Sequence, residues 1–517
     1  MPYKFLLILV VFALVSGIAY QLTPRKYRYI SLLAVSALCL VLMSGAAAVF
    51  LPVTVITTYL AGVMMDNITA KNDTSGMEKA EKKRIRAKVK RRKKLVVWGY
   101  VLINLGILLT LKYFNFFSTA LSGGLNLLGL DTTPVILRLA VPLGLSYYTL
   151  QAISYVIDVF RGKYKAERNV LKLGLFIGYF PQLHEGPFGR YDHLMPQMSG
   201  GTPISVDSLY RGIIRILWGL FEIFMVANRA AILSDAVFSS YAQYGGFTIV
   251  FGGIAFTLQL YAEFVGYIDI VRGVSAIFGI ELASNFDMPF LAENVADFWR
   301  RWHISLGAFF RDYVFYPVST SKWLRALTKN LSFDTGNFVS VTLSLLAVWF
   351  LTGLWHGASA KYICYGLYYF LLIMGCNLLS PLTSELLLKL RVDPKNKLLR
   401  CVRIFFTWIF VLIGMTMFRA ENMSVFFRML GSLFRSGAPF PLLQILEGAD
   451  LATLVLATLV MISGAFFKLR NIDLFGAYNA LKPYQRYIVC FLLFCVVMIF
   501  GAYGLDYIAP DPIYGGF

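Results

Sequence analysis

Long apolar runs without charge alternate with short polar segments along most of the chain. An α-helix needs about 20 consecutive apolar residues to cross a bilayer. Such runs lie near residues 4–20, 29–65, 95–117, 136–158, 168–183, 208–228, 245–268, 336–355, 362–380, 402–418, 451–467 and 484–505. This pattern predicts an all-α polytopic membrane protein with about ten to twelve crossings or re-entrant pieces. No small-residue cleavage site follows the first run, which we expect to be a retained helix and not a signal peptide.

The middle of the chain departs from this plain pattern. Between about 136 and 380, polar and charged residues are embedded in aromatic-rich sequence, and glycine and proline interrupt the helices. Irregular backbone at membrane depth is tolerated only where it is buried in protein or lines a cavity. We therefore expect one integrated membrane domain in three regions. Residues 1–135 form membrane hairpins, 136–422 form a core with a cavity, and 423–517 form further membrane helices.

Composition and charge agree with this interpretation and add an orientation. Hydrophobic residues make up 58% of the chain and charged residues 15%, and the formal net charge is +20. Residues 79–94 alone contain eleven Lys or Arg and one Glu. A basic run can bind nucleic acid, but this one lies between hydrophobic runs. Its position favours a basic cytoplasmic loop over 66–94 that obeys the positive-inside rule and contacts anionic lipid headgroups.

The same rule orients the other connections, because Lys and Arg favour the cytoplasmic side. The segments expected inside are 24–28, 79–94, 161–168, 321–329, 389–403 and 468–470, and those expected outside are 118–135, 437–451 and 506–517. The same rule predicts that the amino terminus lies outside the cell. The expected location is the plasma or inner membrane of the cell.

Two Trp-His steps are the most informative local feature. The chain has only four histidines, and His303 follows Trp302 while His356 follows Trp355. An ionisable group at membrane depth is costly and marks a candidate functional site, and imidazole is suited to moving protons near neutral pH. A hydrogen-bonded packing role is the alternative. It fits a single isolated histidine better than two in the region most interrupted by polar residues.

A neutral histidine can take the proton of a hydroxyl and activate it for attack on an acyl carbon. Burial keeps the imidazole neutral and available as a base. An acyl thioester, carried by coenzyme A or an acyl carrier protein, is a suitable donor because its leaving group departs easily. This chemistry needs no metal and no tightly bound cofactor. The six cysteines form no C-x-x-C pair and are expected to be packing residues.

Signatures of other chemistries are absent from the sequence. It has no G-x-S-x-G, no P-loop, no G-x-G-x-x-G and no H-E-x-x-H. These absences argue against a serine hydrolase, a nucleotide-driven enzyme and a zinc protease of the H-E-x-x-H type.

Residues 294–316 predict one amphipathic helix at a membrane surface or along a solvated cleft. Apolar residues recur there at three- and four-residue steps, at Phe298, Trp302, Leu306, Phe309 and Phe310. Its arginines suggest a start on the cytoplasmic side, which would put His303 nearer the inner face. The run from 336 crosses outward under the charge rule, so His356, bracketed by Gly353 and Gly357, would lie in the outer half of a tight hairpin. If both histidines line one cavity, that cavity could connect the two sides.

Other embedded polar residues are candidates for the same cavity. The full set, with the two tryptophans, is Trp302, Trp355, Glu263, Asp269, Asn285, Arg300, Arg301, Asp312, His184 and Glu185. The acids can equally be structural partners of arginines, and an Asp near His303 can orient an imidazole or neutralise an arginine. His184 and His193 lie in FPQLHEGPFGRYDHLMPQM, which reads as a broken or re-entrant segment with structural or positioning roles.

At these residues the chain resembles the membrane-bound O-acyltransferase family, in particular the bacterial branch typified by the alginate O-acetyltransferase membrane subunit. The segments that carry the resemblance are VPLGLSYYTLQAISYVIDVFRG (141–162), FPQLHEGPFGRYDHLMPQM (180–198), YAEFVGYIDIVRGVSAIFGIELASNFDMPF (261–290), NVADFWRRWHISLGAFFRDYVFYP (294–317), VWFLTGLWHGAS (348–359) and MFRAEN (417–422). The resemblance implies a multi-helix bundle with a central tunnel or funnel. It also implies that His356 is the catalytic residue and that His303 lines the same tunnel and assists.

The resemblance further implies transfer of an acyl group from a cytoplasmic thioester donor towards extracytoplasmic glycans, often with a secreted or anchored acyltransferase as partner. We therefore expect a membrane O-acyltransferase that moves an acyl group, with acetyl favoured, to hydroxyls of a cell-surface or secreted polysaccharide. No nucleic acid partner is expected. A D-alanyl transferase of teichoic acids is the alternative within the class. A transporter and a non-enzymatic scaffold are the alternatives outside it.

Overall fold

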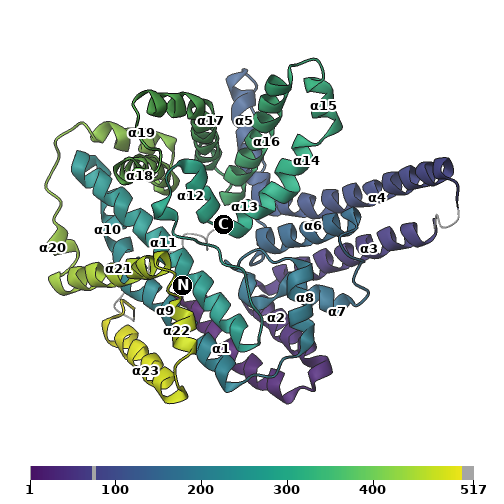
Figure 1. Ribbon diagram of the computed structural model, residues 1–517, viewed down its shortest axis with the longest axis horizontal. Helices are drawn as coiled ribbons and strands as arrows, with labels where there is room; N and C mark the ends of the chain where they lie inside the picture. Colours follow the sequence, from purple (N-terminus) through teal and green to yellow (C-terminus); the bar gives the residue numbers. More distant parts are fainter. Residues whose placement is uncertain (1, 73–76, 504–517) are drawn as a thin grey trace. The chain divides into compact units, whose positions relative to one another are not determined.

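The computed structural model describes residues 2–72 and 77–503, without the side chains of residues 2–10 and 465. These ranges are almost entirely helical (Figure 1). Their strand-like pairing is a single antiparallel bridge between Phe286 and Trp302. The all-α prediction is confirmed. The tail 506–517, which was expected outside the cell, lies beyond the described residues.

The described chain divides into two compact units, and each is considered by itself. The smaller unit comprises residues 5–208 and 274–283, and the larger unit comprises residues 209–273 and 284–503 with residues 2–4. The three regions expected from the sequence follow other boundaries and stay a prediction.

Eight helices belong mainly to the smaller unit. They are α1 (Pro2–Leu22), α2 (Arg28–Ser44), α3 (Phe50–Ala70), α4 (Lys79–Leu108), α5 (Phe114–Leu127), α6 (Leu145–Arg161), α7 (Val170–Gly178) and α8 (Tyr191–Gly200). Figure 1 shows α3 and α4 running side by side as a long hairpin, with α6 packed against both.

The remaining helices lie wholly or mostly in the larger unit. They are α9 (Val206–Phe221), α10 (Asn228–Ser239), α11 (Gly246–Ile277), α12 (Val295–Arg301), α13 (Ile304–Phe310), α14 (Tyr316–Ser319), α15 (Lys322–Thr328), α16 (Phe333–His356), α17 (Ala360–Lys389), α18 (Lys397–Arg419), α19 (Met423–Ser432), α20 (Leu442–Ile445), α21 (Gly448–Leu469), α22 (Leu474–Asn479) and α23 (Pro483–Phe500). A π-helical segment, Glu222–Ala227, joins α9 to α10 without a break.

Nine helical stretches in the described ranges are long and apolar enough to cross a membrane. They are Arg25–Ala70, Lys79–Leu127, Val206–Ser239, Gly246–Ile277, Phe333–His356, Ala360–Lys389, Lys397–Arg419, Gly448–Leu469 and Pro483–Phe500. The protein is therefore a multi-pass membrane protein, as the hydrophobic runs predicted.

Two of the apolar runs do not form full spans. The run at 136–158 was expected to be a crossing or a re-entrant piece, and in the structure residues 130–142 form no helix and α6 begins only at Leu145. Pro134 and Pro142 disfavour helix before each of them, and Gly144 adopts a left-handed φ of +73° at the start of α6. The run at 168–183 yields only the nine residues of α7, roughly 14 Å of helix against a core of about 30 Å.

The prediction of a basic loop over 66–94 is wrong for most of its length. Residues 79–94 are helical and continue without interruption into the apolar part of α4. Lys and Arg are good helix formers, and the segment contains neither proline nor glycine, so helix propagates through the charges. The basic residues thus stand on a rigid helix.

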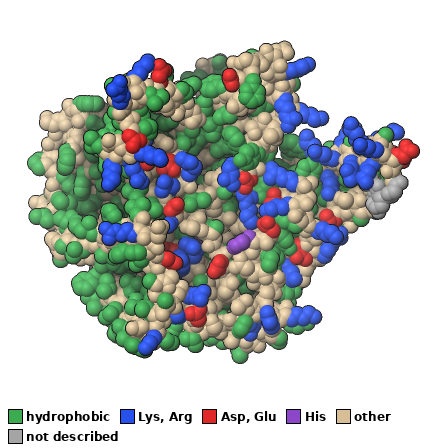
Figure 2. All heavy atoms as spheres, viewed as in Figure 1, with side chains coloured by type: hydrophobic (Ala, Val, Ile, Leu, Met, Phe, Trp, Pro, Cys, Tyr) green, Lys and Arg blue, Asp and Glu red, His purple; other side chains and the backbone are tan. Residues whose placement is uncertain are grey.

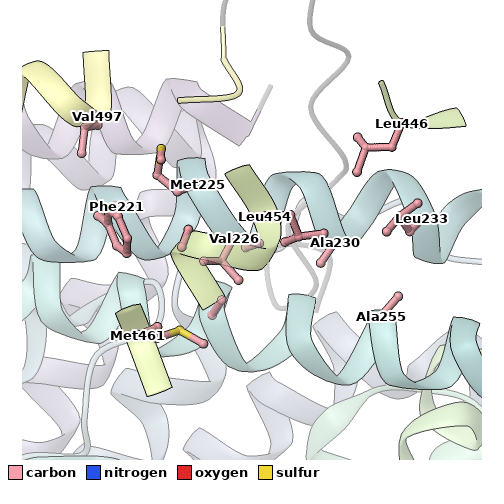
Figure 3. Close-up of a cluster of buried hydrophobic side chains, with 13 residues drawn as sticks. Phe221, Met225, Val226, Ala230, Leu233, Ala255, Leu446, Leu454, Met461 and Val497 are labelled. Atoms are coloured by element: carbon pink, nitrogen blue, oxygen red, sulfur yellow. The ribbon is translucent and has the colours of Figure 1, made fainter. Parts of the chain in front are cut away.

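An apolar core of the larger unit lies where several long helices converge (Figure 3). Side chains of the continuous α9–α10 helix meet those of α11, α21 and α23 there. The labelled core residues are Phe221, Met225, Val226, Ala230, Leu233, Ala255, Leu446, Leu454, Met461 and Val497. At roughly 1.5–3 kcal/mol for each large apolar side chain removed from water, such a cluster would stabilise a soluble fold. In a membrane, close packing contributes more than exclusion of water.

Candidate functional site

His356 is the last residue of α16, at the point where the chain turns into α17. These two helices approach so closely that two glycines are required between them. A Cβ on Gly353 would lie 2.3 Å from the Tyr362 carbonyl oxygen, and a Cβ on Gly366 would lie 2.2 Å from that of Trp349. The tight hairpin predicted from the sequence is confirmed, and it fixes the backbone that carries His356.

The imidazole of His356 is 2% exposed and enclosed by aromatic rings. The ring centroid of Trp355 lies 4.9 Å away, that of Phe418 5.2 Å and that of Tyr365 5.8 Å. Lys361 donates hydrogen bonds to the Phe418 and Ala420 carbonyl oxygens, at 3.1 and 2.8 Å. A cation on α17 thus holds the carboxyl end of α18, a favourable place for positive charge, and keeps the Phe418 ring against His356.

His303 lies at a break between two short helices. The single helix predicted over 294–316 is wrong: α12 ends at Arg301, and α13 begins at Ile304. His303 itself adopts the left-handed region, with φ of +48°. A non-glycine residue in this region is uncommon, although histidine is among the residues that enter it more often. Such outliers cluster at functional sites.

Asn285 creates this break and also fixes the His303 ring. Its backbone carbonyl accepts a hydrogen bond from Ile304 N–H at 3.0 Å, and its side-chain Oδ1 accepts one from Ser305 N–H at 2.9 Å. Its Nδ2 lies 3.2 Å from Nδ1 of His303. Asn285 is fully buried, so a polar atom of Asn285 that lost its partner would be left without a hydrogen bond, which is destabilising.

The proton of His303 can be assigned from these contacts. The Ser305 N–H is a donor, so the Asn285 oxygen must face it and the Asn285 NH₂ must face His303. An NH₂ group only donates, and Nδ1 of His303 must therefore accept. In the neutral ring the proton is then on Nε2, which makes His303 an N–H donor and not a base at that atom. Burial lowers the pKa of His303 to about 3, so the ring is neutral at physiological pH.

Trp355 brings the two histidines together. Its indole centroid lies 5.6 Å from that of His303 and 4.9 Å from that of His356. Both rings contact the same indole, and the sides of the membrane expected from loop charge stay a prediction. Phe298 and Leu306 are 1% and 4% exposed, whereas Arg300 is 72% exposed, so the apolar side of α12 and α13 packs inward and their charged side stays at the surface of the unit.

Trp302 has a different role from Trp355. It is 2% exposed, and its ring stacks on Phe298 at a centroid distance of 5.4 Å and an interplanar angle of 21°. It also contacts Phe286 and Phe290 edge-on. Of the two Trp-His steps, one tryptophan therefore packs beside the backbone before His303, and the other contacts both imidazoles.

Asp269 is an acidic candidate that pairs with arginines. Asp269 on α11 pairs with Arg215 of α9 at 2.8 Å and with Arg272 at 3.7 Å. Glu263, one turn and a half earlier on α11, is 8% exposed. The pairing with arginines that was the structural alternative for Asp269 is thus observed, and the partners are Arg215 of α9 and Arg272 of α11.

The charged residues around His303 also pair with one another. Arg300 and Arg301 both bind Asp297, at 3.2 and 3.0 Å, within α12. Asp312 binds Arg311 at 2.9 Å. Of the two roles considered for the Asp residues, neutralising an arginine is the one found. The amide of Asn285 orients the imidazole instead.

His184 and Glu185 belong to the smaller unit. His184 Nδ1 lies 3.3 Å from Glu185 Oε1, and the Glu185 side chain is 1% exposed. The chain there is a tight turn, since a Cβ on Gly186 would lie 2.4 Å from the Gln182 backbone. The broken segment expected after 180 is confirmed. His193 is exposed on α8, with Gln197 Nε2 3.3 Å from its Nδ1.

Several residues of the site escaped prediction. Phe264 of α11 meets the His303 ring edge-on at 4.8 Å, and Trp299 and Tyr369 extend the aromatic cluster beyond Tyr365. No local motif marks them, because they come from elements far apart in the chain. Across the described residues, no group of three or more His, Cys, Asp or Glu is arranged to hold a metal ion.

The site thus brings two imidazoles into contact with one indole. One of them, His303, presents an Nε2–H donor, and the other, His356, can act as a base. A donor and a base beside each other suit transfer of an acyl group to a hydroxyl, in which an oxyanion develops on the carbonyl while a proton leaves the nucleophile.

Comparison with known proteins gives a consistent result. The profile of the membrane-bound O-acyltransferase family matches residues 167–418. The probable alginate O-acetylase of Pseudomonas putida (strain KT2440) is 33% identical over 374 residues, which cover 71% of this chain and 70% of that protein. The teichoic acid D-alanyltransferase of Bacillus subtilis (strain 168) is 29% identical over 54% of this chain and 69% of its own length. The peptidoglycan O-acetyltransferase of Helicobacter pylori (strain 26695) is 28% identical over 52% of each chain.

Proposed function

The chain belongs to the membrane-bound O-acyltransferase family and is an O-acyltransferase, and from this premise we propose that it transfers acetyl from a cytoplasmic thioester to hydroxyls of a cell-surface or secreted polysaccharide. Acyl-CoA or an acylated carrier protein is the co-substrate. The plasma or inner membrane is the site of action, and a secreted or anchored acyltransferase is a candidate partner on the far side.

The observation that carries this proposal is the contact of both imidazoles with Trp355, at 5.6 and 4.9 Å. His356 takes the proton of the acceptor hydroxyl, and the oxygen attacks the carbonyl carbon of the thioester. The Nε2–H of His303 stabilises the oxyanion of the tetrahedral intermediate. The C–S bond then breaks, and the imidazolium of His356 returns the proton to the leaving thiolate, so that the enzyme is unchanged.

Both histidines are 2% exposed, so substrates reach them through the tunnel that the family resemblance implies. That tunnel stays a prediction. The rings of Tyr362 and Phe418 pack against each other at 5.1 Å and both contact His356. Exclusion of water by these rings would favour transfer to the glycan over hydrolysis of the thioester.

Acetyl is preferred over D-alanyl because the alginate O-acetylase relative matches a larger share of this chain than the teichoic acid D-alanyltransferase does, 71% against 54%. D-alanyl transfer is the second candidate, and it would use the same two histidines. The transferase relatives do not favour the transporter and scaffold alternatives.

The test compares cells that express the wild type, His356→Ala and His193→Ala. Extracellular polysaccharides are isolated and their ester-linked groups identified by mass spectrometry, which separates acetyl from D-alanyl by added mass. We expect loss of one ester type with His356→Ala only. His193 is exposed on α8 and is the matched control. Wild-type ester content with a well-expressed His356→Ala protein would refute the proposal.

A further inference from the structure

The larger unit contains a cavity that is separate from the two histidines. It lies between the amino end of α11 and the segment that joins α19 to α20. Its volume is about 560 Å³, within the range of roughly 300–1,000 Å³ that is usual for small-ligand pockets. The lining includes three phenylalanines, two hydroxyl side chains and one cation, which are Phe247, Phe251, Phe440, Thr248, Ser436 and Arg435.

Backbone contacts hold the two walls of this cavity together. Gly246 N–H donates a hydrogen bond to the Arg435 carbonyl oxygen at 3.3 Å. Glycine is required where the walls meet, because a Cβ on Gly437 would lie 2.2 Å from the Gly245 nitrogen. The cavity is therefore shaped by the backbone before any ligand arrives.

Aromatic surface and a single positive charge are combined in the cavity. The ring of Phe440 packs on that of Phe251 at a centroid distance of 5.5 Å, and Phe247 is 88% exposed. Arg435 is exposed as well. None of the described lining residues carries a carboxylate, and within the part of the chain that the structure describes no ion pair involves Arg435. An anionic ligand would thus meet one cation beside aromatic rings.

Other charges on neighbouring helices are already paired. Asp235 of α10 binds Arg419 at 2.6 Å, and Asp450 of α21 binds Arg229 at 2.7 Å. Figure 2 shows the Lys and Arg side chains gathered along α4 and few of them over α20. Residues 504–517, which include two aspartates, lie beyond the described residues, so the tests below use the whole chain.

Ion pairs at the other end of α11 indicate the side of the membrane on which the cavity lies. Beyond the carboxyl end of α11, Asp287 binds Lys468 at 2.6 Å and Glu293 binds Arg400 at 3.2 Å. Both cations belong to segments that loop charge predicts to be inside. Because α11 is long enough to cross the membrane, its amino end and the cavity are expected outside, as 437–451 is.

The cavity also lies towards the end of α11 that approaches the catalytic histidine. Phe256, five residues after Phe251, stacks on Phe418 with ring centroids 6.5 Å apart, and Phe418 meets the His356 ring at 5.2 Å. Five residues of helix rise by roughly 8 Å. Little more than one turn of α11 and two aromatic contacts therefore separate the cavity from His356, a distance that a few sugar units span.

We propose that this cavity is a subsite for the acceptor, an inference that rests on the proposed function: it holds an acidic sugar of the polysaccharide while another unit of the same chain reacts at His356. Arg435 forms paired hydrogen bonds with the sugar carboxylate. The ring of Phe440 packs against the C–H face of the sugar, as aromatic side chains do in ligand pockets. The hydroxyls of Ser436 and Thr248 exchange hydrogen bonds with those of the sugar.

A sugar accounts for this lining better than other occupants do. A lipid chain would match the rings but would leave Arg435 beside hydrocarbon without an anion, which is costly. A small free anion would match Arg435 but would leave the rings unused. A segment of a partner protein would match both, but the polysaccharide is the one partner that the proposed reaction itself requires on the outer side.

Binding is measured with the full-length protein in an uncharged detergent and without thioester. The probes are fluorescent hexamers of galacturonate and of mannuronate, in which every sugar carries a carboxylate, and the uncharged methyl esters of both. We expect saturable binding of an acidic hexamer in fluorescence anisotropy, about tenfold tighter than that of its ester. Equal affinity for acid and ester would overturn the inference. If no hexamer binds, another occupant such as a segment of a partner protein fills the cavity, and the inference is overturned too.

Two matched variants locate the binding site. Arg435→Gln removes the cation of the cavity, and Arg428→Gln removes an exposed cation of α19 that does not line it. We expect the acidic hexamer to bind about tenfold more weakly to the first variant and as to the wild type to the second. Equal weakening would show diffuse attraction to the surface and would overturn the inference. Should Arg435→Gln fail to fold in a thermal melt, Ser436→Trp, which fills the cavity, must weaken binding of acid and ester alike.

Acyl transfer supplies a second readout, in which binding and chemistry separate. Arg435→Gln should raise KM for an acidic hexamer about tenfold and affect a disaccharide much less, because a disaccharide at His356 does not reach the cavity. A lower kcat with unchanged KM for the hexamer would overturn the inference. Absence of transfer by the wild type would refute the proposed function alone, since binding is measured without the thioester.

Discussion

Changing Asn285 to Asp tests whether His303 serves as a hydrogen-bond donor. In the wild type the Asn285 NH₂ faces Nδ1 of His303 at 3.2 Å and keeps the ring proton on Nε2. A carboxylate has no N–H to donate, so His303 must give it a hydrogen from Nδ1. The proton then leaves Nε2, and that nitrogen becomes an acceptor. The carboxylate oxygen still accepts from Ser305 N–H, so the backbone contact at 2.9 Å survives.

The variant is expected to affect both catalysis and folding, and the two effects are measured separately. Removing one donor from a developing oxyanion lowers kcat by about 10²–10³, or about 3–4 kcal/mol. Folding bears the cost of a carboxylate at a fully buried position, which its hydrogen bonds to Ser305 N–H and to His303 Nδ1–H offset in part. We therefore expect Asn285→Asp to melt below the wild type and the folded protein to transfer acyl groups at least about 100-fold more slowly.

The assay measures acyl transfer and the ring proton in the same preparation. Labelled acetyl thioester and a soluble oligosaccharide acceptor are used at a pH above neutral, where the carboxylate is ionised. Nitrogen-15 spectra of histidine-labelled protein report the tautomer, since the chain has only four histidines.

The matched control is Asn294→Asp. Asn294 Oδ1 caps α12 by accepting from Asp297 N–H at 2.8 Å, and Asp caps equally well. Full activity of Asn285→Asp, or a wild-type spectrum with the proton on Nδ1, would refute the tautomer argument.

Three further predictions concern stability. Because burial lowers the pKa of His303 to about 3, the unfolded chain binds a proton below about pH 6.5 that the folded chain does not. The free energy of unfolding is therefore unaffected by this group above about pH 6.5 and falls by at most about 1.4 kcal/mol per pH unit as the pH drops toward 3. We expect His303→Gln to reduce the dependence of the melting temperature on pH, and an unchanged dependence would contradict this. Gly366→Ala should cost about 1–3 kcal/mol, because the new Cβ would lie 2.2 Å from a carbonyl oxygen of α16. The control is Gly375→Ala on the same helix, which meets nothing within 4 Å and should be neutral or stabilising. Equal melting temperatures for the two variants would show that α16 and α17 can move apart at no cost. Asp269→Asn should cost about 2 kcal/mol, less than a fully buried pair, because it leaves Arg215 without its 2.8 Å partner; an unchanged melt would show that water already solvates this pair.

The sequence predicted the spans and the two histidines, because each depends on local pattern. A run of apolar residues is enough to predict a membrane helix, and a histidine in such a run is unusual by itself. The amphipathic period over 294–316 predicted a single helix, since the period continues through His303. One residue with a left-handed φ leaves no trace in that period, and the cause of the break is Asn285, 18 residues away.

Loop charge is a limited guide for a related reason. It reports on which side a span begins and ends, but it could not show that the His303 ring contacts Trp355. The expected position of His303 nearer the inner face stays a prediction. The basic residues 79–94 were assigned to a loop on their charge alone, although their helix propensity is high. That error came from treating charge as a guide to local structure.

The central claim is that the imidazole of His356 deprotonates the acceptor hydroxyl. The most direct measurement is the rate of transfer of labelled acetyl from a thioester to an oligosaccharide by the purified protein in proteoliposomes, for the wild type and His356→Gln. We predict a rate at least about 100-fold lower for His356→Gln, with an unchanged melt and with wild-type rates for His193→Gln. A folded His356→Gln protein that transfers acetyl within twofold of the wild-type rate would contradict the claim.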